Sequence, residues 1–494
     1  MKRIIQYIIL VFSVSPLPLL AQTATEAYRL SISDPVGTAR NLGVGNSMFA
    51  IGPDFSAIGS NPAGLGGYGK SEFLVTSSFT TSTYSSAFRD DRLNETNGYF
   101  DKFTLPNIGV IFYTRPQHSK WNSSNWSIGM NRTSDYCKEL RYTGNTLGSM
   151  TDSWKENAAG ISPDNLNGFE EGLAYTTGAI YDFENDNIYE TDYNLNPEYA
   201  LRKYESVFIE GGKDELFFAY GADYDQKILF GFSLGMPFVN STQSRYYNED
   251  DGIDNGVPYF NSLEYYSFIH TSGYGWNGKF GIIIKPVKQV NIAVAFHTPT
   301  KLFLIDHYNT TLSYDYTDDE HNGQIFSGSP YGTFNYALRT PWSGTAGIGI
   351  IAGKSGFISA CAKFTEYSSM RYDYSVNGNG HYYDQIEHDV NDDITHKYNS
   401  ALQLNMGGEI VIDKLRFRGG ASMQQSPYRN DQTFNPSYHA GFGYREDHYY
   451  IDLAYVLTKQ EDGYLPYETN DAPPPLVVTD FYHHRITATL GFKF

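Results

Sequence analysis

The chain has 494 residues, a formal net charge of −19 and a mean hydropathy of −0.42, and it is rich in tyrosine (42) and phenylalanine (32). The negative charge argues against a nucleic-acid partner, because phosphate binding needs a basic face. The mean hydropathy is too polar for a helical membrane protein, but it suits strands whose alternate residues face water. Neither a linker nor a shift in composition divides the chain, so one large closed sheet is expected.

The first 21 residues have the layout of a secretory signal peptide. Two basic residues open the chain, an apolar run from Ile4 to Leu20 follows, and Ala21 precedes the expected cleavage site. Removal of residues 1–21 leaves a mature chain that starts at Gln22, with no cysteine at the junction to carry a lipid anchor. No later apolar stretch reaches the about 20 residues of a spanning helix, so an inner-membrane location is not expected.

Residues 22–67 do not alternate between polar and apolar side chains. Asp34 followed by Pro35 resembles a helix N-cap and first helical position, and apolar residues at 39, 42, 49 and 50 indicate a short apolar-faced helix. Glycines interrupt the segment repeatedly, and it is too small to fold alone. We expect it to plug the lumen of a barrel, because about 14 strands enclose a lumen that is either a channel or plugged.

Period-2 alternation predicts fourteen strands in the rest of the chain. The gaps between them alternate between tight turns and long loops, the longest spanning about 134–213. This is typical of up-and-down strands in a bacterial outer membrane, with short turns on the periplasmic side and long loops outside. The strands are predicted near residues 68–80, 106–115, 124–133, 214–224, 227–238, 263–286, 289–305, 336–352, 356–368, 397–411, 414–424, 436–445, 448–459 and 482–494.

The fold class expected for residues 68–494 is therefore all-β, a 14-stranded antiparallel transmembrane β-barrel with an N-terminal plug. The first strand must pair with the last, because unpaired strand edges are not tolerated in hydrocarbon. The last strand shows the two faces expected of such a wall: Ile486 and Phe492 would face lipid, while Arg485 would face the lumen.

One hairpin gives a specific test of this reading. If Ile412 and Asp413 form a two-residue turn, Glu409 stands opposite Arg416 on the lumen face. We therefore expect an ion pair between Glu409 and Arg416.

The longest loop contains a predicted helix. Ser162-Pro163-Asp164 is a plausible helix start, and apolar residues follow at helical spacing as far as Ile180. This stripe could gather lipidic substrate outside the cell, or it could pack the loop onto the barrel rim. Cys137 and Cys361 are the only cysteines, and in an oxidising compartment they either pair or remain free thiols.

The segment GTARNLGVGNSMFAIGPDFSAIGSNPAGL, residues 37–65, resembles the N-terminal hatch of the long-chain fatty acid transporter family, the FadL/TodX-type outer-membrane channels. The likeness extends to the tripeptide Asn61-Pro62-Ala63. Further stretches are similar to that family: GYGWNGKFGIIIKP (273–286), FHTPT (296–300), TPWSGTAGIGIIAGKSGFISA (340–360), EYSSMRY (366–372) and the closing strand with its C-terminal Phe494.

The resemblance implies a monomeric barrel, plugged by residues 22–67 as a hatch, that releases hydrophobic molecules sideways through a gap at a kinked third strand. In this chain Gly129 is the candidate for that kink, since glycine allows a strand to bend. The other interpretation is a small residue in an ordinary wall. Asn61-Pro62-Ala63 would be either a hinge that moves on ligand binding or a static turn of the plug.

A hydrophobic substrate with a polar head needs an apolar slot and a few fixed polar groups. Arginines on the lumen face offer two-point donors to a carboxylate head, although they could serve lumen ion pairs instead. The candidates for the slot are Leu42, Met48, Phe49, Phe55 and Ile58, and those for the head are Arg416, Arg418 and Arg485.

These observations predict a channel for passive uptake of hydrophobic compounds, with long-chain fatty acids first and aromatic hydrocarbons second. No catalytic residue, metal or cofactor is expected: the dinucleotide-like Gly273–Gly278 leads into a strand, and no Gly-x-Ser-x-Gly elbow is present. A surface adhesin or structural barrel and a barrel-embedded lipid hydrolase remain as alternatives. The expected partners are the hydrophobic ligand, outer-membrane lipids and lipopolysaccharide, and the barrel assembly machinery during biogenesis.

Overall fold

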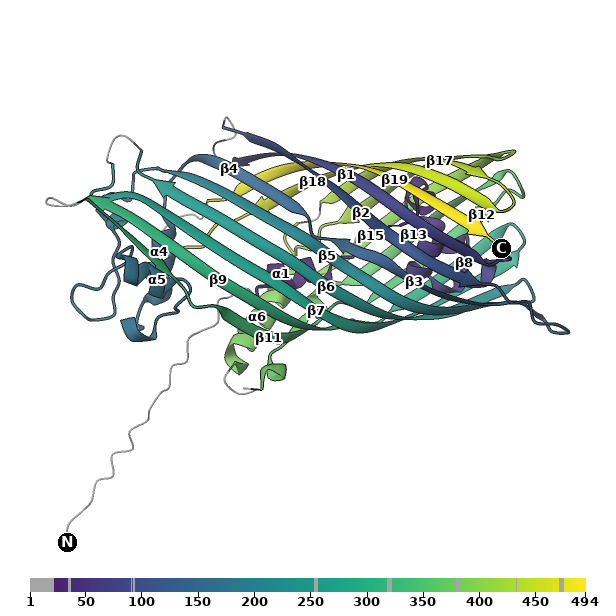
Figure 1. Ribbon diagram of the computed structural model, residues 1–494, viewed down its shortest axis with the longest axis horizontal. Helices are drawn as coiled ribbons and strands as arrows, with labels where there is room; N and C mark the ends of the chain where they lie inside the picture. The colour runs from purple at the N-terminus through teal and green to yellow at the C-terminus, as the bar shows by residue number, and fades with distance from the viewer. Residues whose placement is uncertain are drawn as a thin grey trace, which may run out of the picture.

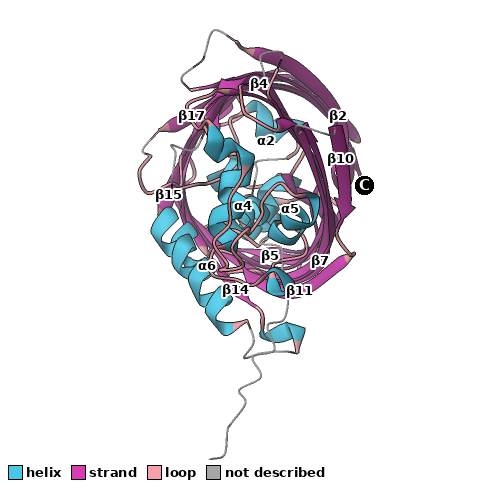
Figure 2. Cartoon of the chain, turned by 90° about the vertical axis from the view of Figure 1, so that its left-hand side faces the viewer, coloured by secondary structure: helices cyan, strands magenta, loops and turns pink. Residues whose placement is uncertain are grey.

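The structure, a computed structural model, describes residues 22–33, 37–89, 91, 94–252, 256–317, 322–378, 383–431, 433–470 and 475–494. The expected signal peptide and the predicted helix start at Asp34-Pro35 lie outside the described residues. The described chain forms a closed antiparallel β-barrel with helices inside it and at one end (Figures 1 and 2). None of its described helices has the length and apolar composition that a membrane crossing requires.

The wall contains nineteen strands in the described part of the chain. They are β1 (Glu72–Phe88), β2 (Thr96–Phe112), β3 (Trp121–Asp135), β4 (Lys138–Thr146), β5 (Leu201–Tyr224), β6 (Ile228–Asp250), β7 (Phe260–Val287), β8 (Val290–His297), β9 (Lys301–Thr317), β10 (Asn322–Gly328), β11 (Gly332–Arg339), β12 (Ser343–Ile351), β13 (Gly356–Glu366), β14 (Arg371–Asp373), β15 (Ser400–Ile412), β16 (Leu415–Gln425), β17 (Phe434–Arg445), β18 (Tyr449–Tyr464) and β19 (Val477–Lys493).

Several of these strands are pieces of one crossing of the wall. β3 continues into β4, β8 into β9, β10 into β11 and β12, and β13 into β14, so the described strands make fourteen crossings. Each crossing coincides with one predicted strand. β1 pairs with β19 from Glu72↔Lys493 to Phe88↔Val477. The predicted number of crossings and the closure between first and last strand are therefore confirmed.

Most helices lie inside the barrel or at its long-loop end, whereas the helix between β14 and β15 lies at the side of the barrel (Figures 1 and 2). Residues before the wall form α1 (Ala24–Ser31), α2 (Ala39–Gly43), η1 (Met48–Ala50), α3 (Phe55–Ser60) and η2 (Pro62–Gly67). The loops carry α4 (Met150–Ala158), η3 (Pro163–Asn165), α5 (Glu171–Thr177), η4 (Asp192–Leu195), η5 (Tyr367–Ser369), η6 (Ser375–Asn377) and α6 (Asp384–Lys397). The cap helices α4 and α5 lie at the end opposite the C-terminus (Figure 1).

The β15–β16 hairpin differs from its prediction. Ile412 pairs with Leu415, so the turn lies at Asp413 and Lys414. Asp413 has a left-handed φ of 51°, which a tight turn requires there. Glu409 therefore stands opposite Arg418, and the expected ion pair with Arg416 is wrong.

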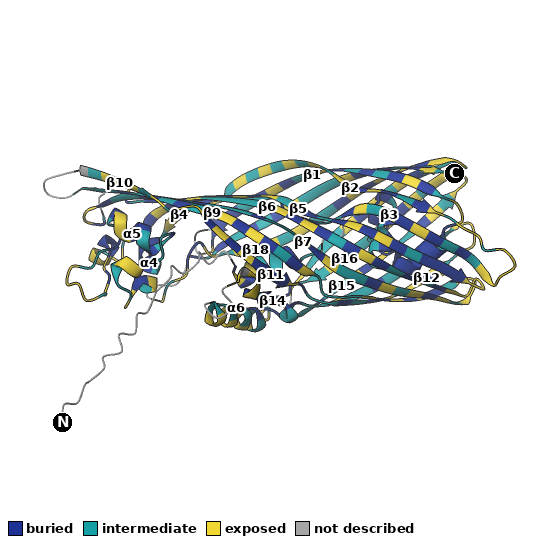
Figure 3. Ribbon diagram, turned by 60° about the horizontal axis from the view of Figure 1, so that its bottom comes forward, coloured by how far each residue is buried: buried dark blue, intermediate teal, exposed yellow. Residues whose placement is uncertain are grey.

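Exposed apolar side chains form a band around the half of the barrel that carries the short turns. Ile486 is 56% exposed and Phe492 46%, and exposed and buried residues alternate along the strands (Figure 3). A closed sheet with an apolar outer band is the geometry of a transmembrane barrel. We call this half the lower barrel and the half toward the long loops the upper barrel. On β5 the boundary lies between Lys213 and Leu216.

The strands run much farther than the sequence predicts. β5 has 24 residues, whereas the alternation of apolar residues predicts only 214–224. In the upper barrel the faces exchange roles, since Val207, Ile209 and Leu304 are buried on the inner side. The upper barrel is therefore built like a water-soluble barrel around an apolar interior.

The longest loop folds into short pieces instead of the single helix predicted after Ser162. η3 covers Pro163–Asn165, and α5 begins only at Glu171. Between them the Asn167 carbonyl accepts bonds from the amides of Glu170 and Gly172, which turns the chain. The apolar residues of this stretch, Leu166, Phe169, Leu173 and Ile180, are buried, so the stripe packs the loop onto the barrel rim.

Candidate functional site

The helix α1 occupies the interior of the upper barrel. Its buried residues Ala24, Ala27 and Leu30 pack within a cluster of mostly aromatic wall and loop side chains. We call this cluster the aromatic interior; its rings are Phe88, Tyr136, Tyr142, Phe169, Tyr308, Phe334, Tyr336, Tyr367, Tyr372, Tyr374 and Tyr398.

The C-terminal end of α1 is held by a buried lysine of the wall. Lys213 Nζ donates to the carbonyl oxygens of Leu30 at 2.8 Å and Ile32 at 2.9 Å. A cation at the last turn satisfies free carbonyls and complements the helix dipole. Lys213 therefore anchors α1 to β5.

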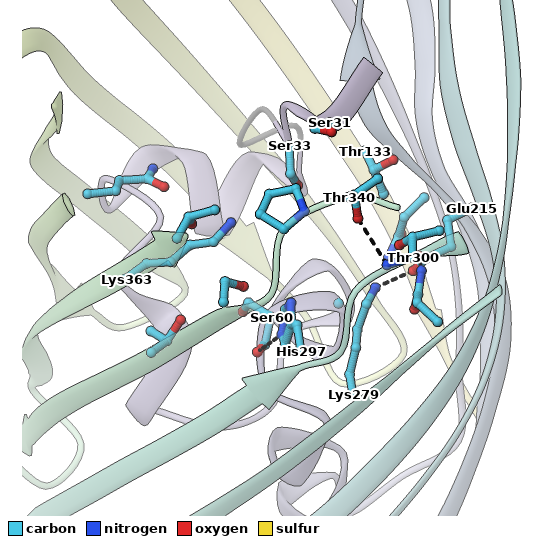
Figure 4. Close-up of a pocket in the computed structure, with 18 of the residues that line it drawn as sticks. Ser31, Ser33, Ser60, Thr133, Glu215, Lys279, His297, Thr300, Thr340 and Lys363 are labelled. Carbon is cyan, nitrogen blue, oxygen red and sulfur yellow. Dashed lines mark hydrogen bonds and ion pairs between the residues drawn. The ribbon is translucent and has the colours of Figure 1, made fainter. Parts of the chain in front are cut away.

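Directly below α1 lies a cavity of about 210 Å³. It is bounded above by Ser31 and Ser33 and below by Ser60, and His297 Nε2 donates a 2.8 Å hydrogen bond to the Ser60 carbonyl (Figure 4). Since a carbonyl only accepts, His297 Nε2 carries the proton. The same view shows Lys279 paired with Glu215 at the edge of the cavity.

The lining of this cavity is polar and carries an excess of positive charge. Arg132, Lys213, Lys279 and Lys363 line it, and Glu215 is the one acid among its described lining residues. Cations at close range favour a negatively charged group over a neutral one. The cavity is therefore suited to a carboxylate or another anionic head group.

Residues 37–67 lie beneath the cavity, against the inner face of the lower barrel. Asn61 is buried, accepts the Ala63 amide at 3.1 Å and donates through Nδ2 to the Phe49 carbonyl at 3.1 Å. A Cβ atom on Gly281 would lie 1.9 Å from Asn61 Oδ1, and one on Gly231 would lie 2.4 Å from the Pro62 carbonyl. Glycines of the wall thus make room for the Asn61-Pro62-Ala63 turn.

Of the apolar residues predicted for a substrate slot, only Phe49 lines the cavity. The others pack the segment onto the wall: Leu42 against Ala454 and Val456, Met48 in a cluster with Phe357, and Phe55 and Ile58 in a cluster with Phe217. These four residues attach residues 37–67 to the wall and do not line the cavity.

None of the three predicted arginines lines the described cavity. Arg418 is buried between Glu409, at 2.6 Å, and Asp452, at 2.7 Å. Arg416 donates to the carbonyls of its own turn, and Arg485 Nε donates to Thr80 Oγ1 at 3.4 Å. For Arg418 the structure shows the ion-pair alternative. Lys279 and Lys363 lie on predicted strands, and reading the lumen face of those strands would have found them.

The wall has an interruption next to the cavity, but not at Gly129. β2 and β3 pair from Asn107↔Asn131 to Phe112↔Trp126, with Gly129 opposite Gly109 inside the ladder. Gly129 instead makes room for the Phe55 ring, which a Cβ would approach to 2.4 Å. Among the described strands, residues 96–104 of β2 pair only with β1, and residues 105 and 106 lie outside both ladders. Segments 96–106 and 132–146 contact each other but share no ladder, and we call this interruption of the ladder the wall break.

Polar contacts bridge the wall break. Lys102 forms an ion pair with Asp135 and donates to the Gly211 carbonyl at 3.2 Å, and Arg132 donates to the same carbonyl at 2.8 Å. Phe103 and Leu105 on β2 are exposed toward the outside at this level. Cys137 lies just beyond Asp135, and both cysteines are free thiols.

Packed loops cover the long-loop end of the barrel. Glu156 of α4 accepts from Thr469 Oγ1 at 2.6 Å and from the Asn470 amide at 2.8 Å, joining two distant loops. Lys203 is fully buried below them and donates to three loop carbonyls, and burial lowers the pKa of Lys203 to about 8.

Comparison with known structures identifies the architecture. A FadL homologue from Pseudomonas aeruginosa matches with a TM-score of 0.56 at 14% identity, covering 94% of this chain and 100% of its own. The fold is that of the FadL-type channels. The toluene transporter TodX of Pseudomonas putida matches with a TM-score of 0.50 at 12% identity and covers 94% of this chain and 100% of its own. No protein-family model and no curated protein sequence matches.

Proposed function

We propose that this FadL-type barrel is an outer-membrane channel for passive uptake of amphipathic hydrophobic molecules with an anionic head, long-chain fatty acids first. The observation that carries the proposal is the cavity with four cationic side chains and one acid directly beneath the aromatic interior. The names of the matching structures, a FadL homologue and a toluene transporter, support a hydrophobic cargo. Aromatic hydrocarbons are the second candidate, but a neutral molecule leaves the cations of the cavity unused.

The two parts of the site would bind the two parts of the ligand. Each methylene buried against the aromatic interior contributes about 0.8 kcal/mol. Because the apolar face of α1 covers the same surface, the tail displaces α1 or lies beside it. The carboxylate would then face Lys213, Lys279 and Lys363 in the cavity.

We propose that residues 37–67 act as a hatch and that cargo leaves sideways through the wall break. The lower lumen is filled by this segment and by charged pairs such as Arg418 with Glu409. Contact with such ion pairs does not stabilise an apolar chain. The wall break opens instead beside exposed Phe103 and Leu105, at the upper edge of the apolar band. Opening requires separation of Lys102 from Asp135.

The rival of a barrel-embedded hydrolase would need a serine and a histidine on the outer face. Ser82 contacts His483 Nδ1 at 2.7 Å and Ser422 contacts His439 Nε2 at 3.0 Å, but all four side chains face the interior. Among the described residues no carboxylate hydrogen-bonds either imidazole, so neither pair has the third member of a catalytic triad. An adhesin would depend on the long loops and not on the cavity.

The test compares uptake of an anion and a neutral molecule through the same barrel. Purified protein in liposomes should carry oleate, and Lys363→Gln should lower oleate uptake about tenfold, as loss of one charge-assisted contact of about 1.5 kcal/mol predicts. Toluene uptake should not change. The matched control is Lys354→Gln, in the exposed β12–β13 turn. Equal losses for oleate and toluene, or no oleate uptake by the unaltered protein, would contradict the proposal.

A further inference from the structure

The N-terminal end of α1 meets a buried carboxylate of the wall. Asp306 of β9 is 1% exposed. Gln22 Nε2 donates to its Oδ2 at 2.6 Å, and the Tyr336 hydroxyl donates to its Oδ1 at 3.2 Å. Thr271 also hydrogen-bonds to this carboxylate through its side chain, and all three donors are neutral. Among the described residues no lysine, arginine or histidine forms an ion pair with Asp306, although a buried carboxylate is strongly unfavourable without a counter-charge.

The nearest charges do not supply the missing cation. Glu26 of α1 adds negative charge near Asp306. Arg29, one turn farther along, is engaged by Glu26 at 2.6 Å and donates to Ser241 Oγ at 2.8 Å. Glu26 is therefore neutralised by Arg29, and Asp306 is left without a partner of opposite charge.

Gln22 is itself only 3% exposed, and it is the first residue expected after signal-peptide removal. Hydrolysis of the Ala21–Gln22 amide consumes one water, leaves a carboxylate on Ala21 and gives Gln22 an α-amino group that is protonated at neutral pH. This reaction creates a cation on the residue that already contacts Asp306.

We propose that the α-ammonium group of Gln22, created by signal-peptide removal, is the counter-charge of Asp306 and that this buried ion pair seats α1 in the upper barrel. Both ends of α1 are then clamped by opposite wall charges, Asp306 at the N-terminal end and Lys213 at the C-terminal end. Each sign is the one that favours the helix dipole at that end. Tyr372 adds a neutral contact, since its hydroxyl donates to the Thr23 carbonyl at 3.0 Å.

The ion pair links processing to the filling of the barrel. A precursor that keeps its signal peptide has a neutral amide at Gln22 and leaves Asp306 without a cation. Cyclisation of an N-terminal glutamine, in which the α-nitrogen attacks the side-chain carboxamide and ammonia leaves, would also remove the charge. The proposal therefore requires a free amine at Gln22, and it does not depend on which molecule the barrel carries.

The test measures the state and reactivity of the N-terminal amine in the mature, folded protein. Mass spectrometry of the N-terminal peptide should give a chain that starts at Gln22 with a free amine. An N-hydroxysuccinimide ester should label this amine at least about tenfold more slowly in the unaltered protein than in Asp306→Asn, because an opposite charge stabilises the protonated, unreactive form. The matched control on β9 is Asp315→Asn, which should label as slowly as the unaltered protein.

A second variant keeps the test decisive if Asp306→Asn does not fold. Insertion of Gly-Ser between Ala21 and Gln22 moves the ammonium group away while Asp306 is retained, and it should restore fast labelling. The proposal is overturned if the mature chain starts at another residue, if the N-terminal glutamine is cyclised, or if the amine reacts equally fast in the unaltered protein and in both variants.

Discussion

The same strands form the lower and the upper barrel, but their apolar side chains point outward in the lower barrel and inward in the upper barrel. On the crossing formed by β8 and β9, Ile292, Val294 and Phe296 point outward, whereas Leu302 and Leu304, only a few residues later, are buried inside. β7 changes in the same way, from exposed Phe280, Ile282 and Ile284 to buried Leu263 and Tyr265. The lower barrel has an apolar outer band, and its interior combines ion pairs such as Arg418 with Glu409 and apolar clusters around Phe55 and Phe357. The upper barrel has a largely aromatic interior.

Under the proposed function, this exchange of faces determines where a hydrophobic ligand would bind. An apolar chain is stabilised in the upper interior but not among the ion pairs of the lower lumen. The cavity and the wall break both lie near the level at which the faces exchange. A ligand held there has lipid beside it and a charged lumen below it, which favours the sideways route.

The largest expected effect tests whether the lower interior depends on charge balance. Glu215→Leu leaves Lys279 buried without its partner and should lower the free energy of unfolding by about 3–5 kcal/mol. The double variant Glu215→Leu/Lys279→Met removes both charges and should recover most of this loss. Urea unfolding in detergent, followed by the heat-dependent shift in gel mobility, measures both. Equal losses in the single and double variants would show that the pair is not the reason for the polar interior.

A smaller effect is expected where residues 37–67 meet the wall. Gly281→Ala places a Cβ 1.9 Å from Asn61 Oδ1, and overpacking of this kind costs about 1–3 kcal/mol. This overpacking destabilises the contact between residues 37–67 and the wall, so the segment should fill the lumen less tightly. Ion conductance through single barrels in a planar bilayer should therefore rise. Gly278→Ala is the control on the same strand, because the nearest atom to its Cβ is 3.6 Å away. Unchanged conductance in Gly281→Ala would argue that this contact does not hold the segment in place.

The wall break gives a kinetic test of the boundary between the two halves. The variant Lys102→Cys/Asp135→Cys is made in a background in which Cys137 and Cys361 are replaced by serine. A short bis-maleimide can then join the two new cysteines across the wall break. Release of oleate to the membrane should slow by about tenfold or more while its binding is unchanged, because only the exit is blocked. The same cysteines capped with N-ethylmaleimide are the control. Equal rates in joined and capped protein would exclude release at this place.

The sequence predicts the lower barrel well because the membrane imposes the period-2 pattern that prediction uses. All fourteen crossings and the lipid face are recovered for this reason. The upper strands are missed because charged residues interrupt their apolar face: in 201–213 of β5, Lys203 and Glu205 lie on the same buried face as Leu201, Val207 and Ile209. The predicted register of β15 and β16 is wrong because the prediction places the turn at Ile412 and Asp413 instead of Asp413 and Lys414. The position of the turn depends on the left-handed φ angle of Asp413, which the alternation of apolar residues does not report.

The candidate site is only partly visible in the sequence. Composition marks residues 22–67 as a filling segment, but it does not separate α1 in the upper barrel from residues 37–67 in the lower barrel. Phe49 lines the cavity while Phe55 fills the space beside Gly109 and Gly129, and both are the same residue type in the same segment. Only packing distinguishes them. The sequence does not indicate Lys213 as a site residue, because the strand predicted from the alternation of apolar residues begins only at residue 214.

The smallest expected effect concerns the hold on α1 in the upper barrel. Lys213→Met keeps the apolar stem but removes the donors to Leu30 and Ile32, and should weaken the seating of α1 by about 1–2 kcal/mol. Amide hydrogen exchange should therefore become roughly ten times faster in α1, whereas amides of β5 below Leu216 should keep their protection. Lys227→Met, in the exposed β5–β6 turn, is the matched control. If exchange in α1 does not change, the aromatic interior alone holds the helix. Lys213 could then bind a ligand in the cavity without displacing α1.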